Sequence, residues 1–182
     1  MIKHKEILNE IDSVLSKVNI LEIDELIRFI NKSNTIVTLG AGRVGMAIKG
    51  FAMRLGHLGF KAYHIGDTSL PSIAKKDLLL VASGSGETQS VYDLVKIAKN
   101  NGSSIFLITG NKESRIAKLS EKTLIVKAPS KVKKVDGLES IQPMTTLNEQ
   151  CLGILFDTIV LEIMEKTGET HKTMWDRHSN LE

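Results

Sequence analysis

The chain has 182 residues, a net charge of +3 and an aromatic content of only 4%. This length suggests one domain. So few aromatic side chains argue against a surface that stacks nucleic-acid bases and against an aromatic carbohydrate cleft. The weak positive charge suits an anionic metabolite but leaves no electrostatic footprint for nucleic acid. The single cysteine, Cys151, excludes an intrachain disulfide and a cysteine-based metal cluster.

The sequence shows no targeting or membrane signal. Charged residues occur throughout the N-terminal stretch 1–12, which lacks the apolar centre of a signal peptide. The longest purely apolar run, around 78–82, is far shorter than the span of about 20 residues that crosses a bilayer. We therefore expect a cytoplasmic protein with no membrane partner.

Residues 1–33 are predicted to form two helices without a chemical motif. Apolar side chains of the first helix recur at helical spacing: Ile7, Leu8, Ile11, Val14, Leu15 and Val18. The second helix is expected at about 23–32. We expect these helices to cover the core or to contact another subunit.

Residues 34–128 carry the pattern of a parallel α/β sheet. Five short runs are predicted to be strands: 35–39, 62–65, 77–82, 104–109 and 123–126. Four of the five are rich in β-branched residues or leucine, which is typical of fully buried strands. Helices are predicted at 44–57 and 88–101. Strands that alternate with helices indicate a five-stranded parallel sheet, and right-handed crossovers place helices on both of its faces.

The C-terminal part, 141–182, is predicted to contain one long helix and a tail. The helix is expected at about 144–166 and is apolar on more than one face, so we expect it to be buried, in part by another subunit. The tail is mostly polar. The basic segment 131–134, which lies between the sheet core and this part, is expected to be a solvated loop.

A first glycine-rich loop, 40–45, follows a predicted strand and opens a helix. Its sequence is G-A-G-R-V-G, which fits the dinucleotide pattern G-x-G-x-x-G, and Asp67 follows about 22 residues later. Glycines allow the backbone to approach an anion closely, and a helix N-terminus supplies free N–H groups. A dinucleotide site is therefore one interpretation, although the chain leaves little room for a second, substrate-binding domain.

A second loop, 83–88, has the sequence S-G-S-G-E-T and again joins a strand to a helix. Hydroxyl groups and backbone N–H groups at a helix N-terminus form a phosphate cradle. The alternative is simple N-capping by Ser85 or Thr88, but three hydroxyls and two glycines exceed what a cap needs. In a flavodoxin-like strand order both loops lie at the topological switch point, where one phosphorylated ligand could contact both.

Several blocks resemble sugar isomerase (SIS) domains and, more narrowly, the 6-phospho-3-hexuloisomerases. The blocks are G-A-G-R at 40–43, F-A-M-R-L-G-H-L-G-F at 51–60, the loop 83–90, I-Q-P-M at 141–144 with Glu149 and Gln150, and R-H-S-N-L at 177–181. They run from residue 40 to the end, and the length of the chain matches that of the family, so the resemblance implies one SIS domain over 1–182. It also implies a five-stranded parallel sheet flanked by helices, no metal, no cofactor and a homotetramer.

The implied activity is an isomerisation of a small phosphorylated sugar. Enzymes of this kind interconvert D-arabino-hex-3-ulose 6-phosphate and D-fructose 6-phosphate in the ribulose monophosphate route of formaldehyde fixation, with a hexulose-phosphate synthase as pathway partner. Such a shift of a carbonyl from C3 to C2 proceeds through a cis-enediol and needs one base near the carbon chain. Donors must also stabilise charge on the oxygens.

The resemblance points to Glu149 as the base and to His57 as a group that moves protons between oxygens or opens the sugar ring. Each has a structural alternative. Thr146-Leu147-Asn148-Glu149 fits a capping box at a helix start. His57 lies near a predicted helix C-terminus, where its charge is favourable.

The remaining candidate residues are expected to bind the sugar phosphate, with a solvated position as the alternative for Arg43 and His178. They are Gly42, Arg43, Val44, Ser83, Gly84, Ser85, Gly86, Glu87, Thr88 and His178. Glu87 is expected to orient its loop rather than to touch the ligand. His178, in the tail, could reach the site of a neighbouring subunit only in an oligomer.

The chain departs from the family pattern at two places. Val44 stands where the family loop G-x-G-R-S-G has serine, so one hydroxyl contact is missing. The stretch P-M-T-T-L-N-E, 143–149, replaces P-M-G-[ST]-x-F-E. Alternatives to the isomerase are another SIS enzyme, a phosphosugar sensor without catalysis, and a small dinucleotide-binding module.

Overall fold

The computed structural model describes residues 2–130 and 138–181. The basic segment 131–134 lies outside the described residues. Five strands form one sheet: β1 (Ile36–Leu39), β2 (Ala62–His64), β3 (Leu78–Ala82), β4 (Ser104–Thr109) and β5 (Lys122–Ile125). All neighbouring strands are parallel and their order is β2-β1-β3-β4-β5. The predicted fold class, with its flavodoxin-like strand order, is confirmed.

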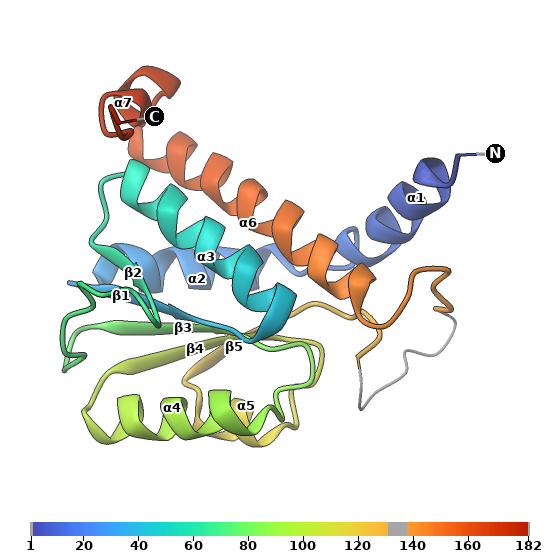
Figure 1. Cartoon of the computed structure of the whole chain (residues 1–182), viewed down its shortest axis with the longest axis horizontal. Helices are drawn as coiled ribbons and strands as arrows, with labels where there is room; N and C mark the ends of the chain where they lie inside the picture. The colour runs from blue at the N-terminus through green and yellow to red at the C-terminus, as the bar shows by residue number, and fades with distance from the viewer. Residues whose placement is uncertain (1, 131–137, 182) are drawn as a thin grey trace.

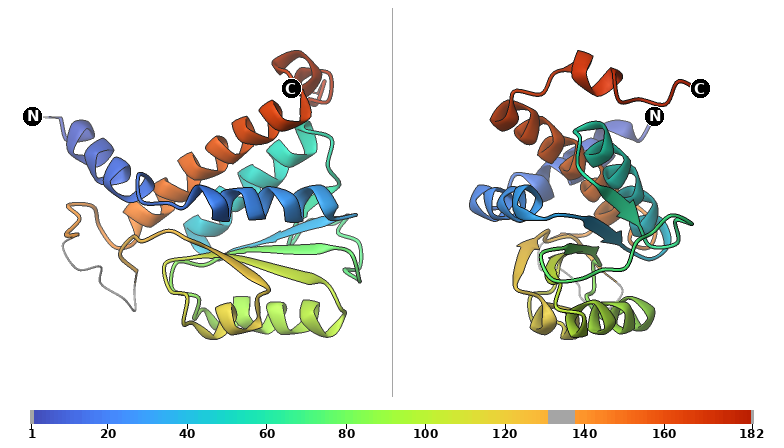
Figure 2. Two further views of the ribbon diagram at one scale, coloured as in Figure 1. Left: turned by 180° about the vertical axis from the view of Figure 1, so that it is seen from behind. Right: turned by 90° about the vertical axis from the view of Figure 1, so that its left-hand side faces the viewer.

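Helices cover both faces of the sheet (Figure 1). They are α1 (His4–Leu15), α2 (Ile20–Lys32), α3 (Gly42–His57), α4 (Gln89–Asn100), α5 (Arg115–Leu119), α6 (Thr146–Thr167) and α7 (His171–Trp175). Helices α4 and α5 lie on one face, while α2, α3 and α6 lie on the other (Figures 1 and 2). The short helices α5 and α7 were not predicted.

The central strands β1, β3 and β4 are buried on both faces, because successive side chains point in opposite directions and helices cover both faces of the sheet, whereas the edge strands β2 and β5 are only partly buried. In β3, Leu78 and Leu80 belong to the core under α2, α3 and α6, whereas Leu79 and Val81 belong to the smaller core under α4 and α5. All five residues of β3 are buried. This explains why the strand reads as a continuous apolar run rather than as an alternating one.

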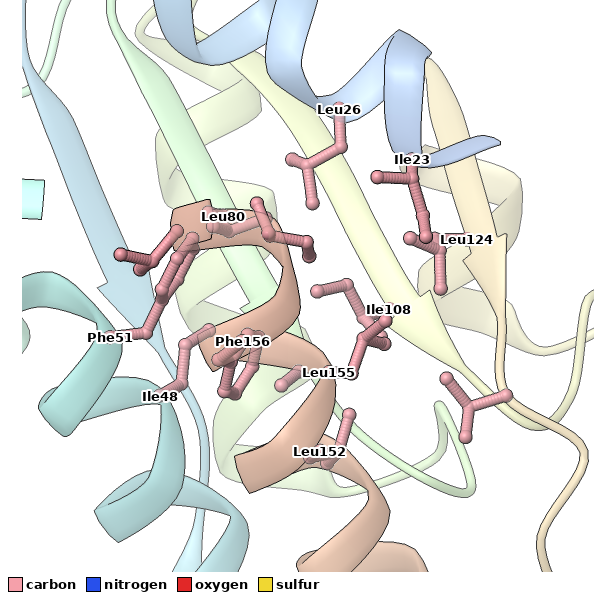
Figure 3. Close-up of a cluster of buried hydrophobic side chains, with 14 of the residues drawn as sticks. Ile23, Leu26, Ile48, Phe51, Leu80, Ile108, Leu124, Leu152, Leu155 and Phe156 are labelled. Atoms are coloured by element: carbon pink, nitrogen blue, oxygen red, sulfur yellow. The ribbon is translucent and has the colours of Figure 1, made fainter. Parts of the chain in front are cut away.

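The larger core joins the N- and C-terminal helices to the sheet (Figure 3). Phe51 of α3 stacks on Phe156 of α6, with ring centroids 4.7 Å apart and planes 11° from parallel. Side chains of α1 and α2 also belong to this core, so these helices act as the predicted cover. In the described residues, no helix has the length and apolar character that a membrane crossing requires.

Helices α3 and α6 pack against each other and run side by side (Figures 1 and 2). Both begin at the carboxyl edge of the sheet and end near α7. Groups at the starts of these two helices are therefore close together, and groups at their ends lie far from that edge.

Candidate functional site

A cavity of about 360 Å³ opens at the carboxyl ends of β1 and β3. This is the topological switch point of the sheet, where ligands of open α/β folds bind. The start of α3, the loop after β3 and the start of α6 supply most of its lining. Its residues are Ala41, Gly42, Arg43, Val44, Ala82, Ser83, Gly84, Ser85, Thr88, Ser130, Met144, Thr145, Thr146, Asn148 and Glu149.

Three helices begin at this cavity, and none of them carries a side-chain cap. Their N-cap residues are Ala41 for α3, Thr88 for α4 and Thr145 for α6, and no side chain of these accepts a cap hydrogen bond. Helices α2, α5 and α7 do begin with such a bond. Uncapped first turns leave backbone N–H groups for a ligand, and the helix dipoles add positive potential. The cavity therefore suits an anion.

The loop after β3 is held by its own polar groups. Ser83 is 5% exposed, and its Oγ accepts a hydrogen bond from the Gly86 N–H at 3.1 Å. Ser85 Oγ accepts a hydrogen bond from the Glu87 N–H at 3.2 Å, within the loop. Neither Ser85 nor Thr88 caps α4, so the capping alternative for these hydroxyls is not realised.

Gly86 and Glu87 brace this loop rather than line the cavity. Gly86 has a φ of 65°, and a Cβ there would lie 2.0 Å from Ser114 Oγ. The Glu87 carboxylate accepts the Arg115 N–H at 3.0 Å and pairs with Arg115 Nε at 3.1 Å. These contacts hold Glu87 within its loop, and its role in orienting the loop for a ligand stays a prediction.

The loop after β1 brings strand and helix into close contact. A Cβ on Gly45 would lie 2.8 Å from the Gly40 carbonyl oxygen, so the first turn of α3 can approach the strand end only with glycine there. Asp67, which the dinucleotide interpretation requires, does not line the cavity. It accepts the His64 N–H at 2.7 Å and faces Lys49 Nζ at 3.6 Å. Because Asp67 makes these contacts outside the cavity, it is not available there to bind the ribose of a dinucleotide.

Glu149 lies in the first turns of α6 with its carboxylate at the cavity. Its side chain is 13% exposed. Oε1 accepts a hydrogen bond from Thr145 Oγ1 at 2.8 Å. Oε2 is buried and lies 3.1 Å from Arg43 Nη1 as an ion pair, and it accepts no hydrogen bond from the described part of the chain. Arg43 Nη1 also donates to Thr146 Oγ1 at 3.2 Å.

The capping-box alternative for Glu149 does not hold in this geometry. In such a box the Glu carboxylate would accept the backbone N–H of the N-cap residue. Helix α6 instead has Thr145 as its N-cap, and the Glu149 carboxylate accepts the hydroxyl of that residue. One carboxylate oxygen is thus held by Thr145, and the other faces Arg43 without accepting a hydrogen bond from the described residues.

His57 and His178 lie together in a second cavity of about 480 Å³. Their ring centroids are 5.2 Å apart, and the ring of Trp175 lies 4.9 Å from that of His178. His57 is the last residue of α3, fourteen positions after Arg43. At about 1.5 Å per residue this separation is about 21 Å. Within one chain, the two histidines therefore do not share the cavity of Glu149.

The cavity also contains groups that the sequence did not single out. Thr145 holds Glu149, and Asn148 and Ser130 contribute polar side chains to the lining. Thr145 and Asn148 could have been found from the stretch 143–149, because its departures from the family pattern fall at these two positions. Ser130 carried no signal in the sequence.

Two titrating groups outside the cavity are shifted by burial. Burial raises the pKa of the Cys151 thiol to about 12, and this residue is the small core side chain that the sequence predicted. Burial lowers the pKa of His64, whose Nδ1 lies 2.8 Å from Thr38 Oγ1. Within 2–130 and 138–181, no group of three His, Cys, Asp or Glu side chains could hold a metal ion.

Comparison with known proteins identifies relatives of this chain among phosphosugar isomerases. The SIS domain family matches residues 29–152. A 3-hexulose-6-phosphate isomerase of Bacillus subtilis is 40% identical over 97% of this chain and 96% of its own. The enzyme of the same name from Methanocaldococcus jannaschii is 37% identical over 96% of this chain and 98% of its own.

Solved structures show the same relationship. A Methanococcus jannaschii protein, whose crystal structure led to the inference of 3-hexulose-6-phosphate isomerase function, superposes with a TM-score of 0.84. It is 35% identical and both chains are covered completely. The chain therefore belongs to the SIS family, in the branch that includes the 3-hexulose-6-phosphate isomerases.

Proposed function

We propose that the protein interconverts D-arabino-hex-3-ulose 6-phosphate and D-fructose 6-phosphate. The observation that carries the proposal is the position of Glu149. A buried carboxylate with one oxygen able to accept a proton lies in the same cavity as the uncapped start of α4. The names of relatives with up to 40% identity over nearly the whole chain support the same reaction.

The phosphate group anchors the substrate in this proposal. The loop 83–88 and the first turn of α4 bind it through hydroxyl and backbone N–H groups. Gly42, Arg43 and Val44 line the facing side of the cavity at the start of α3. The binding energy of the phosphate then positions the reacting carbons, which removes part of the entropic cost of the reaction.

Glu149 is the proposed base. Its Oε2 takes the proton from C2 of the hex-3-ulose, the C–H electrons form a C2=C3 double bond, and the C3 oxygen gains a proton. The resulting cis-enediol then loses the proton of its C2 oxygen while carbon C3 gains one, which yields fructose 6-phosphate. Arg43, whose guanidinium lies beside Glu149, is placed to stabilise charge on the substrate oxygens.

A homotetramer is the proposed assembly, because His57 and His178 can meet a sugar at Glu149 only if another subunit supplies them. Exposed apolar side chains on α3 and α6 support contact between copies. Met53 is 58% exposed and Leu161 is 62% exposed. Mixing Glu149→Gln and His57→Ala subunits tests this for His57: partial recovery of activity in the mixture supports shared sites, and its absence would contradict a role of His57 at the Glu149 of another subunit.

The proposed setting is the cytoplasm and the ribulose monophosphate route, with a hexulose-phosphate synthase as supplier of the substrate. A coupled assay tests the reaction. Ribulose 5-phosphate, formaldehyde and a separate synthase are supplied, and fructose 6-phosphate formation is followed with and without the protein. We expect protein-dependent turnover that Glu149→Gln abolishes. Thermal stabilisation by fructose 6-phosphate without turnover would instead support a phosphosugar sensor or another SIS substrate.

A further inference from the structure

Asn148 is a buried polar side chain whose amide has no hydrogen-bond partner among residues 2–130 and 138–181. It is 2% exposed, and none of the hydrogen bonds within the described residues involves its amide. A primary amide can donate two hydrogen bonds and accept two. Burying such a group without partners destabilises a fold, so native structures rarely contain one without a reason.

The amide of Asn148 faces the cavity between the phosphate loop and the proposed base. Asn148 lines the cavity directly before Glu149 in the chain. The amide itself packs on Gly84, which also lines the cavity, and a Cβ there would lie 2.9 Å from Asn148 Nδ2. The amide of Asn148 therefore fits at this position because Gly84 has no side chain. Ser130 Oγ is also buried at this cavity and has no partner in the described part of the chain.

We infer that Asn148 binds the sugar hydroxyls that lie between the phosphate and the carbonyl, those on C4 and C5. This inference rests on the proposed function. In the substrate, the phosphate is on C6 and the reacting carbons are C2 and C3, with C4 and C5 between them. In the cavity, Asn148 packs on Gly84 of the phosphate loop and directly precedes Glu149 in the chain, so it is adjacent to both the proposed phosphate site and the proposed base. Asn148 thereby becomes a residue that distinguishes sugar phosphates by the hydroxyls on their chain.

The substitution Asn148→Leu separates ligand binding from folding. Leucine has the same branched shape but no polar atoms, so the free protein should unfold at the same temperature or higher. The Kd and KM for fructose 6-phosphate should rise about tenfold, because the hydroxyls lose their partner on binding. The affinity for inorganic phosphate should not change.

Gln142→Leu is the matched control. Gln142 is a buried amide outside the cavity lining, and its Nε2 donates to Glu10 Oε2 at 2.9 Å. We expect this variant to unfold at a lower temperature, because Glu10 loses a partner. If Asn148→Leu also unfolds at a lower temperature but keeps its Kd for fructose 6-phosphate, Asn148 has only a structural role. That result would overturn the inference.

Two further outcomes decide the remaining points. Equal losses of affinity for inorganic phosphate and fructose 6-phosphate in Asn148→Leu would place the amide on the phosphate and overturn its contact with the hydroxyls. A wild-type protein that neither binds nor isomerises fructose 6-phosphate would remove the proposed function and this inference with it. The wild-type measurement therefore distinguishes the two failures.

Discussion

Gly86→Ala tests whether the shape of the phosphate loop depends on glycine. Gly86 has a φ of 65°, and the left-handed conformation costs other residues about 1–2 kcal/mol. The new Cβ would lie 2.0 Å from Ser114 Oγ and 2.5 Å from Ser114 Cβ. Overpacking of this kind costs about 1–3 kcal/mol. We expect a total loss of about 2–5 kcal/mol in the free energy of unfolding.

Ser114 cannot move aside without a further loss. It is 1% exposed, and its Oγ accepts the Ala117 N–H at 3.2 Å as the cap of α5. A displaced cap costs about 1 kcal/mol. The loop itself would then shift, so the Kd for fructose 6-phosphate should rise together with the loss of stability.

Gly42→Ala is the control for this substitution. Gly42 has a similar φ of 59°, but a Cβ there would meet no atom within 4 Å. Its loss should be limited to about 1–2 kcal/mol from the backbone conformation. Urea denaturation measures both variants. Equal stabilities of Gly86→Ala and Gly42→Ala would refute the argument that Ser114 fixes the loop.

Three other substitutions or conditions give separate tests. Thr145→Val removes the hydroxyl that holds Glu149 Oε1, so kcat should fall about tenfold with little change in KM. An unchanged kcat would contradict the role of Thr145 in positioning Glu149. With a pKa of about 12, only about one Cys151 thiol in ten thousand is ionised at pH 8. A thiol reagent should therefore modify Cys151 only after denaturant is added. Rapid labelling of the native protein would contradict the burial of this residue. Because the pKa of His64 is lowered in the folded state, the unfolded chain binds more protons below pH 6.5, and stability should fall as the pH drops through that region. His64→Gln should weaken this fall in denaturation curves measured from pH 7 to pH 5, and an identical pH dependence would exclude His64 as its source.

The sheet was predictable because its strands carry their own signal. A run such as 78–82 is buried on both faces and therefore apolar at every position. The helices between the strands then determine a parallel sheet. The helices α5 and α7 were missed because five residues are too few to show a helical period.

The site was predictable where the loops follow directly from strand ends. Both glycine-rich loops meet at the cavity, as the strand order requires. The separation of His57 from Arg43 could also be predicted from the sequence, because the two residues lie at opposite ends of the predicted helix 44–57. The contact between Glu87 and Arg115 could not be predicted, because it joins the loop after β3 to the start of α5, and only the folded chain brings these two segments together.

The central claim is that Glu149 moves a proton on a sugar phosphate in this cavity. Incubation of fructose 6-phosphate with the protein in D₂O tests it without any coupling enzyme, by following the proton on C3 with NMR. We predict that the wild type replaces this proton by deuterium and forms a second hexulose phosphate, while Glu149→Gln still binds the sugar and does neither. A C3 proton that persists with the wild type, with no new ketose, would contradict the account, as would exchange at the wild-type rate in Glu149→Gln.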